Sequence, residues 1–202
     1  AHRVMPLIKE APMIGGISGS DPTREMRPFL RHLIDLGFSG VMNFPTVGLI
    51  DGRFRQELED TGMGYGKEIE TLKLAKELGL FTMGYAFNEE EAAMVGKAGL
   101  DVLICHMGLT VGGSIGSKYS EDYALKEAAD LVNRMTDAAR KISPDILIFS
   151  HGGPIAMPKD TEYMYQHTES VGFLGASSIE RIPIEQPLMD AVKDFKSCLI
   201  KQ

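Results

Sequence analysis

Cysteine is scarce in this sequence, and long apolar or basic runs are absent. Its two cysteines, Cys105 and Cys198, lie far apart in apolar surroundings, so we expect reduced thiols in a cytoplasmic protein rather than a disulfide framework. No apolar run approaches the roughly 18 residues that a membrane span needs, so no membrane partner is predicted. No lysine- or arginine-rich run offsets the net charge of −7, which argues against a nucleic-acid partner because phosphates bind to clustered basic residues.

Two nucleotide-binding signatures are also missing. The glycine pattern of dinucleotide-binding folds does not follow the first candidate strand, and no glycine-rich loop ends in Gly-Lys-Ser or Gly-Lys-Thr. With 202 residues, of which 44% are apolar and 24% charged, the chain has an ordinary globular composition. We therefore expect one domain over residues 1–202.

Short apolar runs alternate with helical patterns along the chain. The six candidate strands cover residues 13–18, 41–44, 81–86, 101–106, 146–150 and 172–176. Strand-then-helix units without a hairpin signal predict an α/β fold with a parallel sheet and right-handed crossovers. An open doubly wound sheet and a barrel both fit this pattern. We favour a parallel (β/α) TIM barrel that lacks its first two β/α units, because eight units take about 250 residues.

Capping residues mark several helix ends. Asp21 and Pro22 predict the start of the first long helix, whose apolar residues recur at helical spacing. Asn88, with Glu91 three residues later, predicts another start of the capping-box type. The last helix is expected from about Ile184 to Leu199.

Two histidines directly follow apolar strands, His106 after the fourth and His151 after the fifth. In a parallel barrel the carboxyl ends of the strands meet at one mouth, where barrel enzymes build their sites. Histidine can move protons near neutral pH or bind a metal. The alternative is a histidine that only caps a strand end through a backbone hydrogen bond. We expect both rings in the mouth, about 6–10 Å apart, as two groups on either side of a reacting centre.

Two further residues are candidates for the catalytic set. Asn43 follows the second strand and could orient a substrate. Glu59 is expected on a short helix within the long segment of residues 45–66, where it could act as a second acid or base on a closing loop. The alternative is a solvated charged face. No strand end carries the carboxylates of a Mg²⁺ site, and the two histidines lack a third zinc ligand. The sequence therefore identifies no cofactor and gives no support for a divalent metal.

Glycine- and serine-rich turns at the strand ends are candidates for binding an anion. Backbone N–H groups in such turns can surround an anion, and the turn of the last barrel unit often binds phosphate. The alternatives are a flexible turn and an ordinary strand-to-helix turn with a serine N-cap. The predicted anion-binding residues are Gly112, Gly113, Ser114, Gly152, Gly153, Gly175, Ser177, Ser178 and Arg181.

Several unusual strings resemble one known family. Residues 43–52, 61–65, 87–92, 106–110, 151–155 and 175–178 read NFPTVGLIDG, TGMGY, FNEEEA, HMGLT, HGGPI and GASS. They resemble the phosphoenolpyruvate hydrolase-like barrels, also described as phosphonopyruvate hydrolase-like or indole-glycerol-phosphate-synthase-like, which also occur as the C-terminal domain of a plant antiviral resistance protein. The resemblance implies a (β/α)₈ barrel related to phosphoenolpyruvate mutase and isocitrate lyase, with residue 1 falling just before the third strand.

Two functions fit these observations. The first is a hydrolase or lyase that cleaves a small phosphorylated or phosphonate 2-oxo acid, such as phosphoenolpyruvate or phosphonopyruvate, at the barrel mouth. The second is a ligand-binding or regulatory module without chemistry. The two mouth histidines favour the enzyme, and the missing carboxylate set favours the module. A homo-oligomer is also expected, because a barrel gap would expose sheet edge and apolar interior unless another chain fills it.

Overall fold

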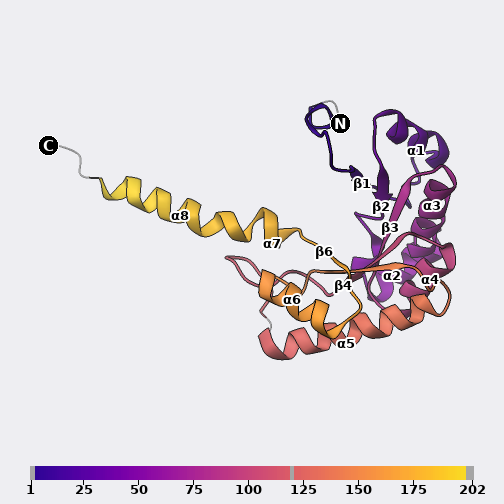
Figure 1. Ribbon diagram of the computed structural model, residues 1–202. Coiled ribbons are helices and arrows are strands. Elements are labelled where there is room, and N and C mark those ends of the chain that lie inside the picture. The colour runs from indigo at the N-terminus through magenta and orange to yellow at the C-terminus, as the bar shows by residue number, and fades with distance from the viewer. Residues whose placement is uncertain (1–2, 119–120, 199–202) are drawn as a thin grey trace.

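The computed structural model describes residues 3–118 and 121–198 and contains one six-stranded parallel sheet (Figure 1). Its strands follow each other in chain order, from β1 to β6, and every neighbouring pair is parallel. The strands are β1 (Ile14–Gly16), β2 (Gly40–Met42), β3 (Phe81–Ala86), β4 (Val102–His106), β5 (Leu147–His151) and β6 (Gly172–Leu174). The prediction of six parallel, consecutive strands is confirmed, although β1, β2 and β6 are shorter than expected.

Helices lie on the outer face of this sheet, and the sheet curls around its inner face (Figure 1). An open doubly wound sheet would carry helices on both faces, so the curled arrangement supports the barrel. Within the described residues β1 and β6 are the two edges of the sheet and are not paired with each other. The helices are α1 (Met26–Asp35), α2 (Gly52–Asp60), α3 (Tyr65–Glu77), α4 (Glu89–Ala98), α5 (Glu121–Arg140), α6 (Pro158–His167), α7 (Ser177–Glu180) and α8 (Ile182–Ser197), with short 3-10 turns at Met5–Leu7 and Val47–Leu49.

One of the two helix starts predicted from capping residues is correct. Asn88 caps α4, and its Oδ1 accepts a hydrogen bond from the backbone N–H of Glu91 at 2.9 Å. Asp21 does not cap α1, which begins five residues later at Met26. The Asp21 carboxylate instead accepts from both the backbone N–H and the hydroxyl of Thr23. This local turn competes with helix capping for the same carboxylate, so the prediction was wrong.

The two faces of the sheet carry two separate apolar clusters, because successive strand residues point to opposite faces. Val41, Leu103 and Ile148 belong to the outer cluster, which packs beneath the helices. The inner cluster contains Met83, Tyr85, Val102 and Ile104, with Met42, Phe149 and Leu174 packed against it. Strand residues two places beyond Ile104 and Phe149 therefore face the inside of the half-barrel.

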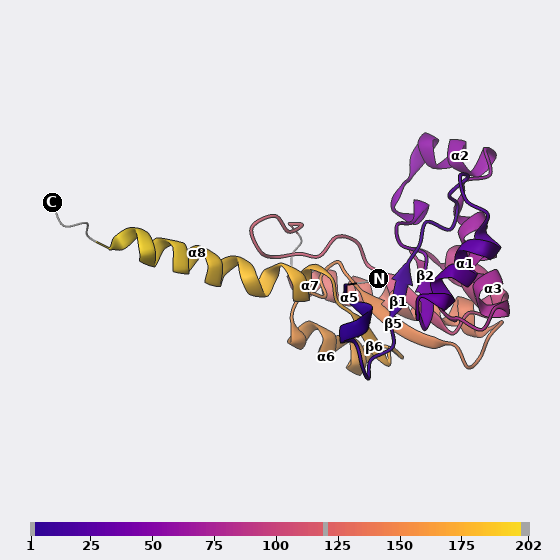
Figure 2. The same ribbon diagram turned by 90° about the horizontal axis from the view of Figure 1, so that it is seen from above.

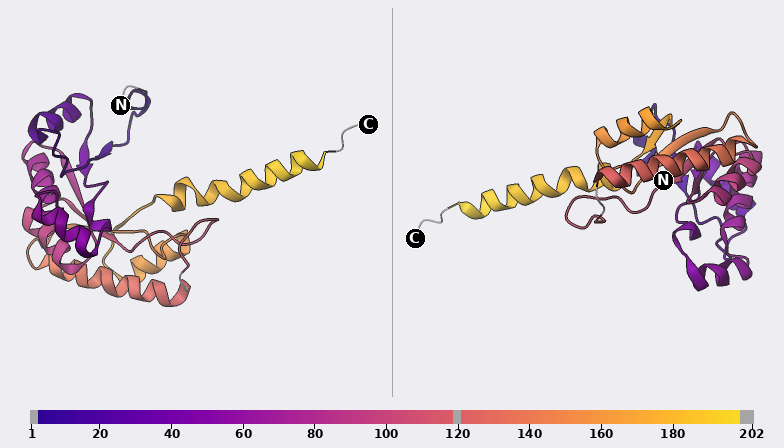
Figure 3. Two further views of the ribbon diagram at one scale, coloured as in Figure 1. Left: turned by 180° about the vertical axis from the view of Figure 1, so that it is seen from behind. Right: turned by 90° about the horizontal axis from the view of Figure 1, so that it is seen from below.

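Helix α8 projects from the body of the molecule, as the views from the front and from behind both show (Figures 1 and 3). Its predicted start near residue 184 is within two residues of the observed one, and the predicted end at Leu199 lies outside the described residues. In the described part of the chain, no helix is long and apolar enough to cross a membrane. The projecting helix exposes large apolar side chains, among them Ile184, Leu188, Met189, Val192 and Phe195.

Candidate functional site

Two histidines end neighbouring strands on the inner face of the half-barrel. His106 ends β4, His151 ends β5, and the two residues are paired in register. Both rings are nearly buried, and their centroids are 4.7 Å apart. We expected a gap of about 6–10 Å, enough for a reacting centre between the rings. The predicted distance between the rings was too long, because residues paired on adjacent strands lie about 4.8 Å apart.

The Nδ1 atoms of the two rings make opposite hydrogen bonds. The backbone N–H of Gly108 donates to Nδ1 of His106 at 3.0 Å. Nδ1 of His151 lies 2.7 Å from the carbonyl oxygen of Leu174, and since a carbonyl can only accept, this Nδ1 carries the hydrogen. A neutral imidazole has one N–H and one lone pair. Nε2 of His106 is therefore a donor, and Nε2 of His151 is an acceptor.

Burial keeps both rings neutral near pH 7. Burial, and then the neighbouring His151, lower the pKa of His106 from 6.5 to about 4. Burial also lowers the pKa of His151, although its hydrogen bond to Leu174 opposes this shift. Burial raises the pKa of Tyr85 to about 12, so this phenol keeps its proton. The site therefore offers hydrogen-bond donors and an acceptor without a formal charge.

Aromatic side chains surround the two histidines. The Tyr85 ring lies edge-on to His151 at 5.2 Å and 5.7 Å from His106, measured between centroids. Phe87 stands 4.6 Å from His106, and Phe44 stands 5.4 Å from Tyr85. We call Phe44, Tyr85, Phe87, His106 and His151 the histidine site. Because both imidazole rings are buried, the hydrogen bonds that their Nε2 atoms can make are stronger than in water.

Asn43 lies beside this site, but its amide is used within the protein. Its side chain is fully buried; Nδ2 donates to Glu68 at 2.8 Å, and Oδ1 accepts from the backbone N–H of Tyr85 at 2.7 Å. Thr46 and the backbone of Val47 donate to the same Glu68 carboxylate. Burial raises the pKa of Glu68, against the effect of these hydrogen bonds. The observed position of Asn43 suits holding Tyr85 in place.

Glu59 belongs to a different part of the surface. It lies on α2, where its carboxylate accepts from Arg55 at 2.7 Å and from the backbone N–H of Tyr65 at 3.0 Å. Partial burial opposes ionisation, but these hydrogen bonds lower the pKa of Glu59 overall. Arg55 also binds Glu91, and all three side chains line a cavity of about 690 Å³. None of the described contacts joins Glu59 to either histidine.

Four of the predicted anion-binding residues come together at the start of α8. Arg181 donates to the carbonyl oxygen of Gly112 at 3.2 Å and to the Glu185 carboxylate at 2.7 Å. The backbone N–H and the hydroxyl of Ser114 also donate to Glu185, at 2.7 and 3.0 Å. Gly113 lies against this ion pair, where a Cβ would overlap Arg181 and Glu185. The loop and the arginine thus form one cluster of donors around a carboxylate.

Gly152 and Gly153 form a tight turn beneath the loop that follows β4. Both have positive φ, at 72° and 58°, a region that favours glycine. A Cβ on either residue would overlap a backbone carbonyl of that loop, at Gly108 or Met107. The N–H of Gly153 already donates to Gly108 at 2.7 Å. These two glycines therefore fit a packing role that lets the two loops approach.

The last predicted turn covers residues 175–178, and its second half, Ser177 and Ser178, forms the start of the short helix α7. Ser178 lines an apolar cavity of about 380 Å³ together with Phe173 and Ile179. The Ser177 carbonyl accepts from the backbone N–H of Arg181 at 3.2 Å. The turn thus carries Arg181 to its place, while none of its described hydrogen bonds reaches the loop at Ser114.

Sequence reasoning missed three residues of these sites. Tyr85 follows Met83 at the strand period of two, which signals a shared face. Glu68 immediately precedes the apolar stripe of α3 and so lies at the edge of a buried face. Glu185 is four residues after Arg181, the spacing of a helical ion pair. Each signal is local and common, so none of them distinguishes a site from ordinary packing.

Within the described part of the chain, no three His, Cys, Asp or Glu side chains converge as ligands of one metal ion. Among the described residues, the buried carboxylates Glu68, Glu91 and Asp160 are each hydrogen-bonded within the protein. The donors and acceptors at the histidine site are therefore the chain's own imidazole and phenol groups.

The chain has relatives among curated proteins and solved structures. Two proteins of Solanum lycopersicum, the ToMV resistance protein Tm-1(GCR237) and the ToMV susceptible protein tm-1(GCR26), are each 46% identical over 198 residues. These matches cover 98% of this chain but only 26% of each tomato protein, so the chain spans about a quarter of the length of these curated relatives.

A solved structure of FabK (M276A mutant) from Thermotoga maritima superposes with a TM-score of 0.50 at 20% identity, over 84% of this chain and 45% of that one. This likeness concerns the fold alone. The family model described as phosphoenolpyruvate hydrolase-like matches residues 1–198. The chain belongs to the phosphoenolpyruvate hydrolase-like family.

Proposed function

We propose that this chain is a catalytic half-barrel that cleaves a small phosphorylated or phosphonate 2-oxo acid, such as phosphoenolpyruvate or phosphonopyruvate. One observation carries the proposal: the two neighbouring imidazoles at the barrel mouth present opposite Nε2 edges, a donor on His106 and an acceptor on His151. A proton acceptor beside a neutral hydrogen-bond donor is what acid–base chemistry on a carbonyl compound needs. The family match supports the substrate class.

The reaction can be written with these two side chains alone. His151 Nε2 takes a proton from water, and the water oxygen bonds to phosphorus. The P–O bond of phosphoenolpyruvate or the C–P bond of phosphonopyruvate breaks, and its electron pair leaves with the enolate of pyruvate. The Nε2–H of His106 donates a hydrogen bond to the enolate oxygen, which stabilises the developing charge. The proton held by His151 then goes to the enolate carbon, giving pyruvate and phosphate.

The second candidate function is a ligand-binding or regulatory module without chemistry. The tomato relatives favour it, because their names describe resistance and susceptibility to ToMV. The position of Glu59 also favours the module, because its described contacts join it to Arg55 and Tyr65 and not to either histidine. The proposed second acid or base is therefore not beside the two imidazoles.

A direct assay separates the two functions. The purified chain is incubated with phosphoenolpyruvate or phosphonopyruvate, and released phosphate and pyruvate are measured. We expect His151→Asn to lower the rate by about 10²–10⁴-fold, the usual contribution of a general base. His167→Asn is the matched control, because His167 Nδ1 also bonds a carbonyl, that of Tyr163 at 2.8 Å, but on the surface of α6. Substrate binding without product release, or equal rates in both variants, would support the module.

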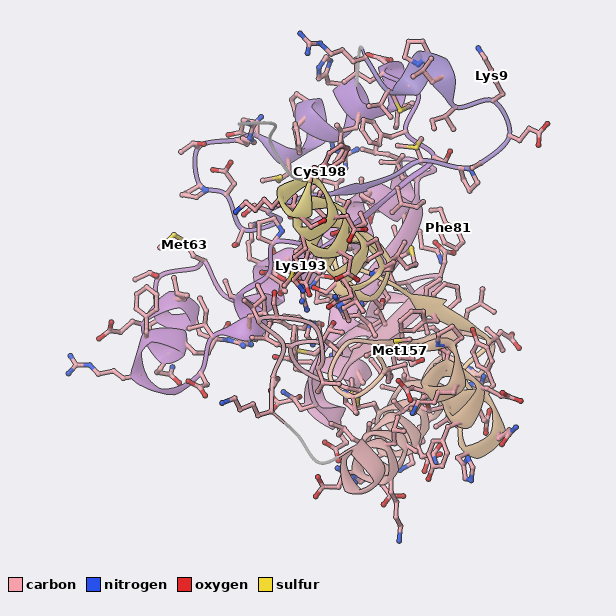
Figure 4. All side chains as sticks on the ribbon, turned by 90° about the vertical axis from the view of Figure 1, so that its left-hand side faces the viewer. Lys9, Met63, Phe81, Met157, Lys193 and Cys198 are labelled. Atoms are coloured by element: carbon pink, nitrogen blue, oxygen red, sulfur yellow. The ribbon has the colours of Figure 1, made fainter. Side chains whose placement is uncertain are left out.

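We also propose that the chain forms a homodimer in which α8 packs against a second copy. Ile184, Leu188, Val192 and Phe195 recur at helical spacing and form one exposed apolar stripe. The chain also exposes an apolar cavity of about 380 Å³ between α6 and α7, whose lining includes Met157, Tyr165, Phe173 and Ile179. Figure 4 looks onto α8 from its C-terminal end, with Met157 labelled on the body beneath it.

A second copy fits this cavity better than the chain's own helix. Only Arg181 separates α7 from α8, and α7 itself supplies Ile179 to the cavity wall. The bonds of Glu185 to Arg181 and Ser114 hold the first turn of α8 on a course away from the body (Figure 1). A two-fold axis would let each copy place its stripe in the other's cavity, as a self-complementary interface requires.

A further inference from the structure

The cluster of Gly112, Gly113, Ser114 and Arg181, which we call the anion cradle, is filled by a carboxylate of the same chain. Glu185 Oε1 accepts from Arg181 at 2.7 Å and from the Ser114 hydroxyl at 3.0 Å. Glu185 Oε2 accepts from the Ser114 backbone N–H at 2.7 Å. A guanidinium, a backbone amide and a hydroxyl therefore converge on one negatively charged group, which is the donor set of an anion site.

The loop is shaped for this contact. Gly112 and Gly113 have φ of 79° and 70°, which L-residues with a Cβ rarely adopt. A Cβ on Gly113 would overlap both Arg181 and Glu185. The glycines therefore let the loop backbone approach the arginine and aim the Ser114 N–H at the carboxylate. The loop after β4 and the start of α8 lie side by side in two perpendicular views (Figures 1 and 2).

We propose that the anion cradle is a binding site for a phosphate group and that Glu185 is its internal competitor. Hydrogen bonds from Arg181 and Ser114 lower the pKa of Glu185, so the carboxylate is charged at neutral pH and occupies the cradle as an anion. A phosphate dianion brings a second negative charge and a third oxygen to the same donors. The inference concerns a site distinct from the two histidines and does not depend on the proposed reaction.

Displacement of Glu185 has a structural consequence. Glu185 lies in the first turn of α8, and Ser114 belongs to the loop that follows His106 on β4. The Ser114–Glu185 hydrogen bonds are thus a tie between that loop and α8. A bound phosphate would replace this tie, so the site couples an acidic ligand to the position of the projecting helix.

Calorimetric titration with inorganic phosphate tests the proposal. We expect Glu185→Gln to bind phosphate at least tenfold more tightly than the wild-type chain, because the competing charge is gone while the loop is kept. Glu180→Gln is the matched control, since it removes the same charge one residue before Arg181 and should leave the affinity unchanged. Adding Arg181→Gln to Glu185→Gln should abolish binding.

Backbone NMR supplies the second measurement, because the Ser114 amide signal should shift on phosphate addition in Glu185→Gln but not in the double variant. Should Glu185→Gln misfold, Glu185→Ala provides the same comparison. Equal phosphate affinity in the wild-type chain and in the folded Glu185 variant, or binding that persists without Arg181, would overturn the proposal. His151→Asn in the Glu185→Gln background should still bind phosphate, so loss of catalysis and loss of the anion cradle are distinguished.

Discussion

His106 and His151 have the same side chain and equivalent positions at the ends of paired strands, yet the hydrogen bonds at their Nδ1 atoms are opposite in direction. The difference comes from the backbone group that each ring meets. Nδ1 of His106 accepts from the Gly108 N–H, and Nδ1 of His151 donates to the Leu174 carbonyl. The sequence also allowed a histidine that only caps a strand end through a backbone hydrogen bond. Both rings do make such a bond. A backbone hydrogen bond is compatible with the proposed role of each ring, since the bond at Nδ1 sets the state of Nε2.

The low pKa of His106 predicts a pH dependence of stability. Its pKa is about 4 in the folded chain against 6.5 for a free histidine, so between these values the unfolded chain binds more protons. The stabilisation is complete above about pH 6.5 and is lost as the pH falls towards 4, by about 3 kcal/mol for a shift of this size. Urea unfolding at several pH values should show a larger loss in the wild-type chain than in His106→Asn, whose Oδ1 can replace Nδ1 and in which only the lowered pKa of His151 remains from this pair. Parallel pH profiles would contradict it.

At the scale of elements, a buried polar network joins β2, β3 and α3 behind the histidine site. Asn43 follows β2, Tyr85 lies on β3, and Glu68 lies on α3. The amide of Asn43 bridges them: its Nδ2 donates to the Glu68 carboxylate, and its Oδ1 accepts from the backbone N–H of Tyr85. A carboxylate buried to this extent requires hydrogen-bonding partners. The elements that hold Tyr85 against the histidines are therefore fixed by polar contacts as well as by apolar packing.

Removing the amide should cost stability. We expect Asn43→Ala to lower the free energy of unfolding by about 2–4 kcal/mol, because it leaves the Glu68 carboxylate and the Tyr85 N–H short of a buried partner. Asn133→Ala is a suitable control, since Asn133 makes one surface hydrogen bond, to the His167 carbonyl at 3.0 Å, and should cost less than about 1 kcal/mol. Urea denaturation of the three proteins measures the difference. A cost for Asn43→Ala no larger than the control would rule out the network as a stabilising element.

At the scale of the whole molecule, β1 and β6 are the unpaired edges of the sheet among the described residues, and one helix stands clear of the body (Figure 1). Burying a large apolar side chain is worth about 1.5–3 kcal/mol, and the stripe on α8 offers four such side chains, Ile184, Leu188, Val192 and Phe195. A reciprocal contact between two copies would bury both stripes. The resulting gain would offset the loss of translational and rotational freedom on association, about 4–15 kcal/mol.

Sedimentation equilibrium tests this assembly. The wild-type chain should have the mass of a dimer, and Leu188→Asp should have that of a monomer because a buried unpaired charge opposes the contact. Lys193→Glu lies on the same helix, away from the stripe, and should remain dimeric. A wild-type chain that stays monomeric over the accessible concentration range, or a Leu188→Asp variant that still dimerises, would exclude the α8 interface.

Much of the architecture could be predicted from local pattern. The apolar runs that end at Ala86, His106 and Ser150 mark β3, β4 and β5 within a residue, because buried strands are continuous in sequence. The start of α1 was missed, because Asp21 has two competing local uses and only the folded turn selects one. The distance between His106 and His151 was missed for a different reason, since strand register joins residues far apart in the chain.

The sequence by itself determined where apolar residues recur, where strands end and that two histidines follow neighbouring strands. These features depend on periods of two and 3.6 residues within short segments. The tertiary structure alone decided what each polar side chain contacts. Asn43 finds Glu68 and Tyr85, and Glu185 finds Ser114, at separations of 25, 42 and 71 residues. Such contacts depend on the curvature of the sheet and the course of α8, and these arise from packing over the whole chain rather than from any local pattern.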